Sequence, residues 1–196
     1  MTAPRLIAIT PGKVAYDLEA AITTLGKHSW PAIILREPHR SATENDALIQ
    51  LALDVGIKSV ICHEKSAYTI RTGKTHVGEG WLGSPSTEKV GVSCHNAAQV
   101  QSALNAGAHY TLLSPLFTPT SKPNDSRAPL GLPNFLAIAK DRPVLALGGI
   151  NPDNYAAVLA AGVYGVAIMG SIFNNPKSVE MFLRIYRNQK IKSSSS

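Results

Sequence analysis

Short and nearly continuous apolar runs recur along the chain, separated by longer stretches of mixed polarity. Runs without polar alternation are typical of strands that are buried on both faces, as in a parallel sheet. Eight runs have this character, the fourth less clearly than the others. They are Leu6–Ile9, Ala32–Leu35, Ser59–Cys62, Thr75–Val77, Val90–Ser93, Tyr110–Leu113, Val144–Leu147 and Gly165–Met169.

Several stretches between these runs have the periodicity of a helix with one apolar face. The predicted helices cover residues 46–55, 96–106, 151–161 and about 176–187. Strands that alternate with helices indicate a closed barrel or a doubly wound sheet. Eight strand–helix units in 196 residues favour the barrel, an α/β fold with a single compact (β/α)8 TIM barrel. We expect this domain to cover residues 1–190 and the serine-rich segment 191–196 to be a disordered tail.

Composition and charge favour a cytoplasmic protein that binds small anions. Hydrophobic residues make up 44% of the chain, no apolar run is long enough to span a membrane, and the first residues lack a signal-peptide pattern. The net charge of +6 suits small phosphorylated substrates. The basic residues form no stripe with interleaved aromatics, which argues against nucleic acid as a partner. These observations leave a homodimer open.

Two glycine motifs follow the last two predicted strands, at the end of a barrel where active sites form. Gly148 and Gly149 come directly after one strand, and Gly170 and Ser171 come after the next. Backbone N–H groups in such loops can converge on a phosphate without any side-chain charge. Glycines also permit tight turns, but two such loops in equivalent positions favour a phosphate-binding site.

The loop after the sixth predicted strand adds hydroxyl groups and a cation. It reads Ser114-Pro-Leu-Phe-Thr-Pro-Thr-Ser-Lys122. A lysine that follows several hydroxyl groups at a barrel mouth is more often a phosphate contact than a solvated side chain. We therefore predict that Ser121 and Lys122 contact a phosphate or pyrophosphate.

Other polar residues follow the second to fifth predicted strands. Arg36 is a candidate ligand contact, whereas for the neighbouring Glu37 we favour a salt bridge at the barrel rim. His63, His76 and His95 lie near the ends of three consecutive strands, so a three-histidine metal site is one interpretation. Nothing in their spacing requires a metal, and ordinary hydrogen-bonded histidines are favoured.

Five motifs occur in the order found in one enzyme family. They are Leu35-Arg-Glu37, Gly91-Val-Ser-Cys-His95, Ser114-Pro-Leu-Phe with Ser-Lys122, Ala146-Leu-Gly-Gly-Ile150 and Val166-Ala-Ile-Met-Gly-Ser171. Together they resemble the thiamine phosphate synthase family, which includes the thiazole tautomerases of the TenI group, over nearly the whole chain. The resemblance implies a barrel that binds thiazole phosphate at the loops after strands six to eight.

The resemblance also implies a reaction and roles for particular residues. A synthase joins thiazole phosphate to hydroxymethylpyrimidine pyrophosphate, and pyrophosphate leaves with help from Mg²⁺ and basic residues. By this resemblance, Arg36, Ser93 and Lys122 lie around the pyrimidine and the pyrophosphate. Ser121 matches a hydroxyl position of the loop. The phosphate cradle would be formed by Gly148, Gly149, Gly170 and Ser171.

Some positions depart from the family pattern. The family's Gln-x-Arg-x-Lys reads Ile34-Leu-Arg-Glu-Pro38, its Asn-Asp reads Cys62-His63, and its His-Leu-Gly-Gln-x-Asp reads His76-Val-Gly-Glu-Gly-Trp81. Both aspartates that would hold Mg²⁺ are therefore absent. Glu64 and Glu79 are weak candidates to replace them, because Mg²⁺ accepts any well-placed carboxylate.

Three functions remain open on these residues. A thiamine phosphate synthase, a transferase with a remodelled metal site, is our leading prediction. A metal-independent thiazole tautomerase is the second, with His95, His63 or Glu79 as the proton carrier, since Pro115 stands where we associate a histidine with that branch. A non-catalytic relative that only binds a phosphate ligand is the third.

Overall fold

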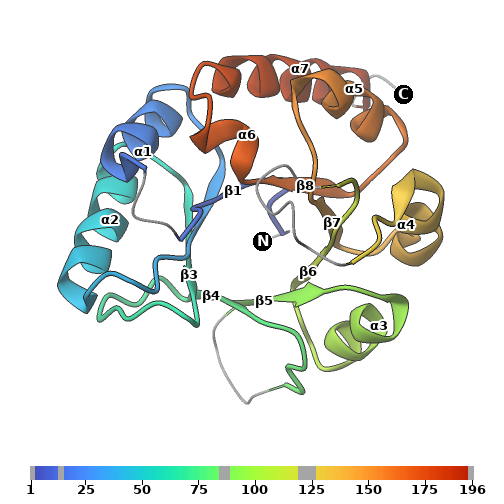
Figure 1. Cartoon of the computed structure of the whole chain (residues 1–196), viewed down its shortest axis with the longest axis horizontal. Helices are drawn as coiled ribbons and strands as arrows, with labels where there is room; N and C mark the ends of the chain where they lie inside the picture. Colours follow the sequence, from blue (N-terminus) through green and yellow to red (C-terminus); the bar gives the residue numbers. More distant parts are fainter. Residues whose placement is uncertain (1–2, 13–15, 84–88, 119–126, 194–196) are drawn as a thin grey trace.

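The structure, a computed structural model, describes residues 3–12, 16–83, 89–118 and 127–193. Eight parallel strands close into a barrel in chain order, with β1 paired to β8 (Figure 1). The strands are β1 (Leu6–Ile9), β2 (Ala32–Leu35), β3 (Ser59–His63), β4 (Lys74–Val77), β5 (Lys89–Cys94), β6 (Tyr110–Leu113), β7 (Val144–Leu147) and β8 (Gly165–Ile168). The predicted TIM barrel is confirmed, and each predicted strand matches to within one residue at either end.

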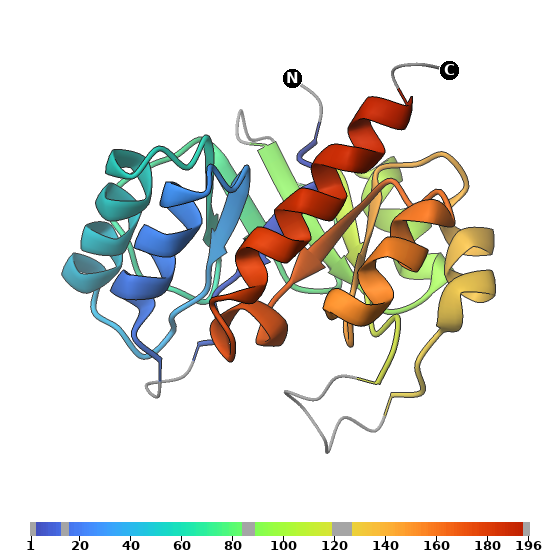
Figure 2. The same cartoon turned by 90° about the horizontal axis from the view of Figure 1, so that it is seen from above.

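Helices surround most of the barrel (Figures 1 and 2). They are α1 (Leu18–Lys27), α2 (Ala42–Asp54), α3 (Ala97–Asn105), α4 (Gly131–Ala139), α5 (Pro152–Ala160), α6 (Gly170–Phe173) and α7 (Ser178–Ser193). The predicted helices correspond to α2, α3, α5 and α7. The helix α7 continues to Ser193, into the segment expected to be a disordered tail, and residues 194–196 lie outside the described ranges.

Side-chain caps explain where two helices begin after their strands. Ser41 accepts a hydrogen bond from the Glu44 N–H, and the Glu44 carboxylate accepts one from the Ser41 N–H. Asn151 caps α5 in the same reciprocal way with Asn154. Such capping boxes satisfy N–H groups that a helix start leaves unpaired, and they fix the exit of the chain from β2 and β7.

Alternate strand residues fill the barrel interior, as the two-residue period of a strand requires. The interior cluster consists of Ile7, Ile9, Ala32, Ile34, Ile61, Tyr110, Leu112, Leu145 and Ala167. Tyr110 is its aromatic member, and its ring crosses the interior beside Gly91. A Cβ atom at Gly91 would overlap that ring, so this glycine makes room for Tyr110.

Loops flank β4, whereas α2 packs against β3 and α3 against β5. Residues 64–73 and 78–83, on either side of β4, contain no helix, and this side lies at the lower edge of Figure 1. The Asp46 carboxylate of α2 accepts hydrogen bonds from the N–H groups of Thr69 and Ile70, which ties the first loop to the neighbouring helix. Within the described ranges, no helix has both the length and the hydropathy needed to cross a membrane.

Candidate active site

A pocket of about 220 Å³ opens at the carboxyl ends of the strands, the end of a barrel at which active sites form. Every strand, or the loop that follows it, contributes to its walls. The lining residues are Ile9, Arg36, His63, Lys65, His76, Gly78, Glu79, Ser93, His95, Leu112, Ser114, Arg127, Leu147 and Met169. Candidate residues named from the sequence therefore lie together, among them Arg36, His63, Ser93, His95 and Glu79.

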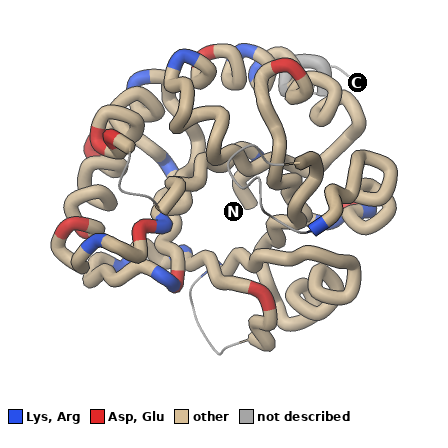
Figure 3. The backbone as a smooth tube through the Cα atoms, viewed as in Figure 1, with Lys and Arg blue, Asp and Glu red and all other residues tan. Residues whose placement is uncertain are grey.

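Three cationic side chains and one carboxylate border this pocket: Arg36, Lys65, Arg127 and Glu79. Elsewhere the charged residues lie mainly on the outer helices and the loops (Figure 3). Among the described residues the one salt bridge joins Arg40 to Glu19, so no described carboxylate neutralises Arg36. The excess of positive charge suits a phosphate or pyrophosphate ligand.

The loop after β1 helps to position Arg36. The Arg36 N–H donates to Thr10 Oγ1 at 2.8 Å. Gly12 has a φ of +66°, and a Cβ atom there would lie 2.8 Å from Arg36 Nη1, so the glycine admits the guanidinium. The buried Glu37 accepts a hydrogen bond from the Gly12 N–H at 3.0 Å. The described partner of Glu37 is thus a backbone N–H in place of the expected cation, and Glu37 holds the Gly12 loop beside Arg36.

A hydrogen-bond chain runs from the barrel interior to the pocket wall. Tyr110 Oη lies 3.2 Å from His76 Nδ1, and His76 Nε2 lies 2.9 Å from Ser93 Oγ. Burial, with a smaller effect from His63, lowers the pKa of His76 to about 3. So weak a base does not activate Ser93 as a nucleophile. The chain instead fixes the position of the Ser93 hydroxyl.

His63 is a second neutral imidazole at this end. Burial, followed by the charges of Arg36 and Lys65, lowers the pKa of His63 to about 4. Its Nδ1 accepts a hydrogen bond from the Lys65 N–H at 3.1 Å. Among the residues that the structure describes, no three His, Cys, Asp or Glu side chains are arranged to hold a metal ion. The interpretation of the histidines as hydrogen-bonded side chains is therefore favoured over a three-histidine metal site.

His95 connects the loops that follow β5 and β6. Its Nδ1 lies 2.8 Å from the Ser114 carbonyl oxygen and 3.3 Å from Ser114 Oγ. Arg127 Nη1 lies 2.6 Å from Nε2 and 2.7 Å from Nδ1, so the guanidinium contacts the edge of the ring that carries both nitrogens. In this arrangement His95 positions the Arg127 cation at the pocket.

Gly148 and Gly149, at the start of the loop after β7, occupy positions where a side chain would clash with the loop after β6. Their φ angles are +105° and +64°. A Cβ atom on Gly148 would lie 3.0 Å from Pro115, and one on Gly149 would lie 2.6 Å from Phe117. The glycines thus let the loop after β6 pack closely, and phosphate binding by their N–H groups stays a prediction.

The neighbouring loop after β8 is held to the same region. Gly170 begins the short helix α6, and Ser171 Oγ donates to the Ile150 carbonyl oxygen at 2.6 Å. This bond brings the two predicted phosphate loops together, although none of their four predicted residues lines the pocket. Ser121 and Lys122 lie outside the described residues.

The described carboxylates do not fit a protein-held Mg²⁺ ion. Glu64 is exposed, and its Oε1 accepts a hydrogen bond from the Gly78 N–H at 2.5 Å. Glu79 lines the pocket and accepts a hydrogen bond from Gln99 Nε2 at 2.8 Å. Mg²⁺ usually binds through one or two carboxylates and completes its octahedral shell with waters and substrate phosphates, so Glu79 would hold it only together with a bound pyrophosphate.

Two cations of the pocket are not among the predicted site residues. Lys65 lies two residues beyond β3, so its position after a strand end was a usable signal. Arg127 comes from a polar stretch without periodicity, and its partner His95 is 32 residues away. No local pattern in the sequence indicates that contact.

Comparisons with known proteins place the chain among its relatives. Residues 82–172 match the family described as thiamine monophosphate synthase. A thiamine-phosphate synthase of Azoarcus sp. (strain BH72) is 32% identical over 149 residues, which cover 71% of this chain and 72% of that protein. One of Roseiflexus sp. (strain RS-1) is 33% identical over 140 residues, which cover 66% of this chain and 59% of that protein. The chain thus matches less than two thirds of the Roseiflexus protein.

Similarity of structure extends over almost the whole chain. A thiamine phosphate pyrophosphorylase from Pyrococcus furiosus superposes with a TM-score of 0.75 at 22% identity, covering 94% of this chain and 96% of that one. This match supports the barrel fold. The Azoarcus protein supports a closer relationship, because the aligned segment covers most of both chains. The chain belongs to the thiamine monophosphate synthase family.

Proposed function

We propose that this chain is a transferase that joins hydroxymethylpyrimidine pyrophosphate to thiazole phosphate, giving thiamine phosphate and pyrophosphate. The observation that carries the proposal is the cationic pocket at the carboxyl end of the barrel, where Arg36, Lys65 and Arg127 outnumber the single carboxylate of Glu79. Membership of the family suggests the reaction, and the pocket supplies charge of the sign that the reaction requires.

In this reaction the bond between the pyrimidine methylene carbon and a pyrophosphate oxygen breaks, and its electron pair leaves with the pyrophosphate. The lone pair of the thiazole nitrogen then forms a new bond to the same carbon. Negative charge grows on the leaving group, so cations that are already in position lower the barrier. The guanidinium groups of Arg36 and Arg127 suit this role, since each can donate to two phosphate oxygens at once.

Neutral groups of the pocket suit the organic part of the substrates. The Ser93 hydroxyl is held by His76 and can orient a heteroaromatic ring through one hydrogen bond. Apolar side chains from four strands or their ends lie in the same pocket and can pack against the ring: Ile9, Leu112, Leu147 and Met169. Polar orientation within an apolar lining is typical of small-molecule sites.

A metal-independent isomerase acting on a thiazole phosphate is the second candidate. The small number of described carboxylates at the pocket favours it, because tautomerisation needs only groups that move protons. Glu79 is the described carboxylate at the pocket and would be the first proton carrier to test.

The experiment supplies the protein with both transferase substrates, across a series of divalent cations and with a chelator, and follows thiamine phosphate. Product formation supports the transferase, and no product under any condition contradicts it. Chelator-resistant isomerisation of the thiazole carboxylate phosphate alone would support the second candidate. Binding of both substrates without turnover would identify a non-catalytic relative.

The substitution Arg36→Gln tests the role of the pocket's charge. We expect kcat/KM to fall about a hundredfold, because one preorganised cation at the leaving group is removed. Arg187→Gln is the matched control, since Arg187 is exposed on α7 and donates to the His28 carbonyl oxygen. Equal effects of the two substitutions would contradict the placement of pyrophosphate beside Arg36.

A further inference from the structure

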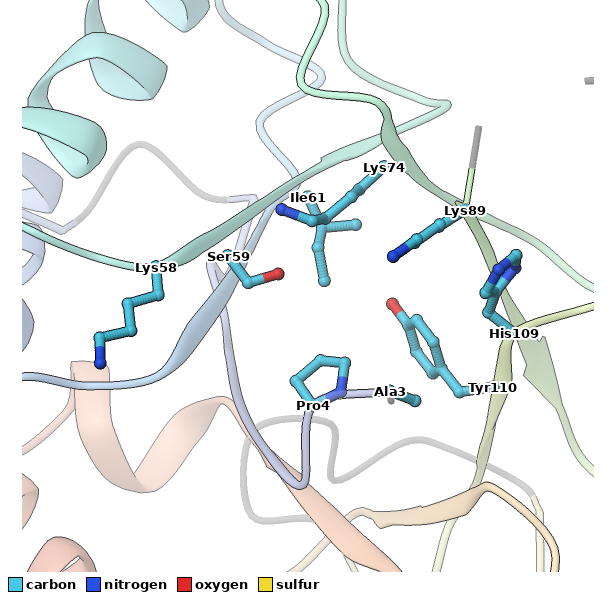
Figure 4. A pocket seen from close by; sticks show the side chains of 9 residues that line it. All are labelled: Ala3, Pro4, Lys58, Ser59, Ile61, Lys74, Lys89, His109 and Tyr110. Carbon is cyan, nitrogen blue, oxygen red and sulfur yellow. The ribbon is translucent and has the colours of Figure 1, made fainter. Parts of the chain in front are cut away.

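A second pocket, of about 180 Å³, opens at the opposite end of the barrel, where the strands begin (Figure 4). Its walls come from the starts of β3 to β6 and from residues 3–4 before β1. The polar side chains that border it include Ser59, Lys74, Lys89, His109 and Tyr110. The proposed reaction makes no use of its two strand lysines.

Lys74 and Lys89 are direct neighbours on paired strands. They are opposite one another in the register of β4 and β5, and their side chains reach into the pocket in Figure 4. Like charges on directly paired residues destabilise a sheet. Both lysines are half-buried, so solvent screens their repulsion less than it would on an open surface. This repulsion favours a ligand of opposite charge between them.

Neutral hydrogen-bond donors face the same space. The hydroxyl groups of Ser59 and Tyr110 point into the pocket, and the His109 ring stands at its rim (Figure 4). Lys58 also borders the pocket, but its side chain runs away from the centre in this view. Together with the two lysines, the donors therefore converge from four consecutive strands, β3 to β6.

No acidic group among the described residues offsets this charge. None of the lining residues is acidic, and the described part of the chain contains one salt bridge, which involves neither lysine. The two ammonium groups thus share one pocket without a described counter-ion.

We propose that this pocket binds a small oxyanion of the phosphate class, either free phosphate or pyrophosphate or the phosphate group of a small organic molecule. Two ammonium groups and two hydroxyl groups offer charge-assisted and neutral hydrogen bonds to its oxygens. The apolar part of the pocket, formed by Pro4, Ile61 and the Tyr110 ring, would face an organic substituent. The inference does not depend on the proposed reaction at the other end of the barrel.

Calorimetric titration with pyrophosphate, phosphate and glycerol phosphate tests the proposal. We expect wild-type protein to bind pyrophosphate at two sites, one at each end of the barrel. The double substitution Lys74→Gln/Lys89→Gln should remove one site or weaken it about a hundredfold, at about tenfold for each charged hydrogen bond lost. The double substitution Arg36→Gln/Arg127→Gln should remove the other site and leave this one.

Matched controls separate the pocket from net charge. Lys27→Gln/Lys177→Gln removes two exposed lysines and should leave both sites intact. The proposal would be overturned if Lys74→Gln/Lys89→Gln protein still bound pyrophosphate at two sites with unchanged affinity. It would also be overturned if Lys27→Gln/Lys177→Gln weakened pyrophosphate binding as much. Tighter binding of glycerol phosphate than of phosphate at this site would identify an organic ligand, and the reverse would identify a free anion.

Thermal unfolding gives a second readout. Without ligand, Lys74→Gln/Lys89→Gln should raise Tm, because the repulsion between the lysines is removed. Added pyrophosphate should raise Tm less than in the wild type, because one stabilising site is lost. A lowered Tm together with an undiminished pyrophosphate shift would contradict the proposal.

Chemical labelling avoids substitutions at the pocket. In Arg36→Gln/Arg127→Gln protein, pyrophosphate should slow the acetylation of Lys74 and Lys89 but not that of Lys27 or Lys177, as measured by mass spectrometry. Unchanged acetylation of Lys74 and Lys89 at saturating pyrophosphate would overturn the proposal.

Discussion

The two ends of the barrel both present cations, but the chain supplies them in different ways. At the carboxyl end, Lys65 and Arg127 come from loops, and hydrogen bonds through His95 hold Arg127 in place. At the amino end, Lys74 and Lys89 are strand residues whose direction follows from the pairing of β4 with β5. Substitutions in loops can therefore change the cations at the carboxyl end. The positions of Lys74 and Lys89 at the amino end depend on the pairing register of the barrel strands.

The material between the two pockets is also different from an ordinary barrel core. We call the pocket at the amino end of the barrel the lower pocket and the one at the carboxyl end the upper pocket. Tyr110 borders the lower pocket and is hydrogen-bonded to His76, which is hydrogen-bonded to Ser93 in the upper pocket. A polar chain of three side chains therefore lies where branched apolar residues usually fill a barrel.

Acidification should produce the largest effect, and it acts on the upper end. His63 and His76 have pKa values lowered to about 4 and about 3, whereas an unfolded histidine titrates near 6.5. Below pH 6.5 the unfolded chain binds more protons than the folded protein, so the free energy of unfolding falls as pH falls. We expect a loss of about 4 kcal/mol between pH 7 and pH 5, measured by urea unfolding.

The substitution His63→Gln should remove about half of that pH dependence. The exposed His39 provides the control, and His39→Gln should leave the slope unchanged. The carboxyl groups of Glu44 and Asp46 have pKa values lowered by their hydrogen bonds to Ser41 and Thr69, so they contribute mainly below pH 5. If the free energy of unfolding did not change between pH 7 and pH 5, the two histidines would not be neutral in the folded protein.

The substitution Gly91→Ala should have the next largest effect, because it disturbs the centre that both ends share. The added methyl group would overlap the Tyr110 ring. We expect a loss of about 3 kcal/mol in the free energy of unfolding, as overpacking of a core can cause. In a Tyr110→Leu background the same substitution should cost much less, and equal costs in both backgrounds would rule out the clash.

The smallest effect should come from Tyr110→Phe. It removes the hydroxyl that pairs with the fully buried His76 and leaves Nδ1 without that partner. We expect a loss of about 1 kcal/mol in unfolding free energy. Tyr155→Phe is a close control, since the buried Tyr155 hydroxyl has no hydrogen-bond partner among the described residues. That control should be neutral, and a neutral result for both would show that the Tyr110–His76 bond adds nothing.

The sequence predicts the strands well because each one is a compact apolar run with a polar or glycine end. Helix α4 is harder to predict, since it starts at Gly131 without a side-chain cap and contains Pro133 in its first turns. Helix α1 carries a clear signal in Leu18, Ala21, Ile22 and Leu25, with Asp17 as its cap, and could have been found.

The candidate site is predictable where a residue follows a strand directly, as Arg36 and His95 do, or lies at its end, as Ser93 does. It is not predictable where a contact depends on the path of a loop. Arg127 meets His95 only because the chain returns to the barrel mouth before α4. The lower pocket requires the pairing of β4 with β5, which the hydrophobic pattern of each strand alone does not give.

The chain of Tyr110, His76 and Ser93 links the hydrogen-bonding character of the two pockets. If His76 carries its proton on Nδ1, that N–H donates to Tyr110 Oη. The Tyr110 O–H can then donate a hydrogen bond to a ligand in the lower pocket. Nε2 then accepts the Ser93 proton, so Ser93 offers only lone pairs to the upper pocket. If the His76 proton is on Nε2 instead, that N–H donates to Ser93, and Ser93 can donate to the upper pocket. Tyr110 then donates to Nδ1 and offers only lone pairs to the lower pocket. An anion below and a ligand with an N–H group above would therefore select the same tautomer and favour each other's binding across the barrel.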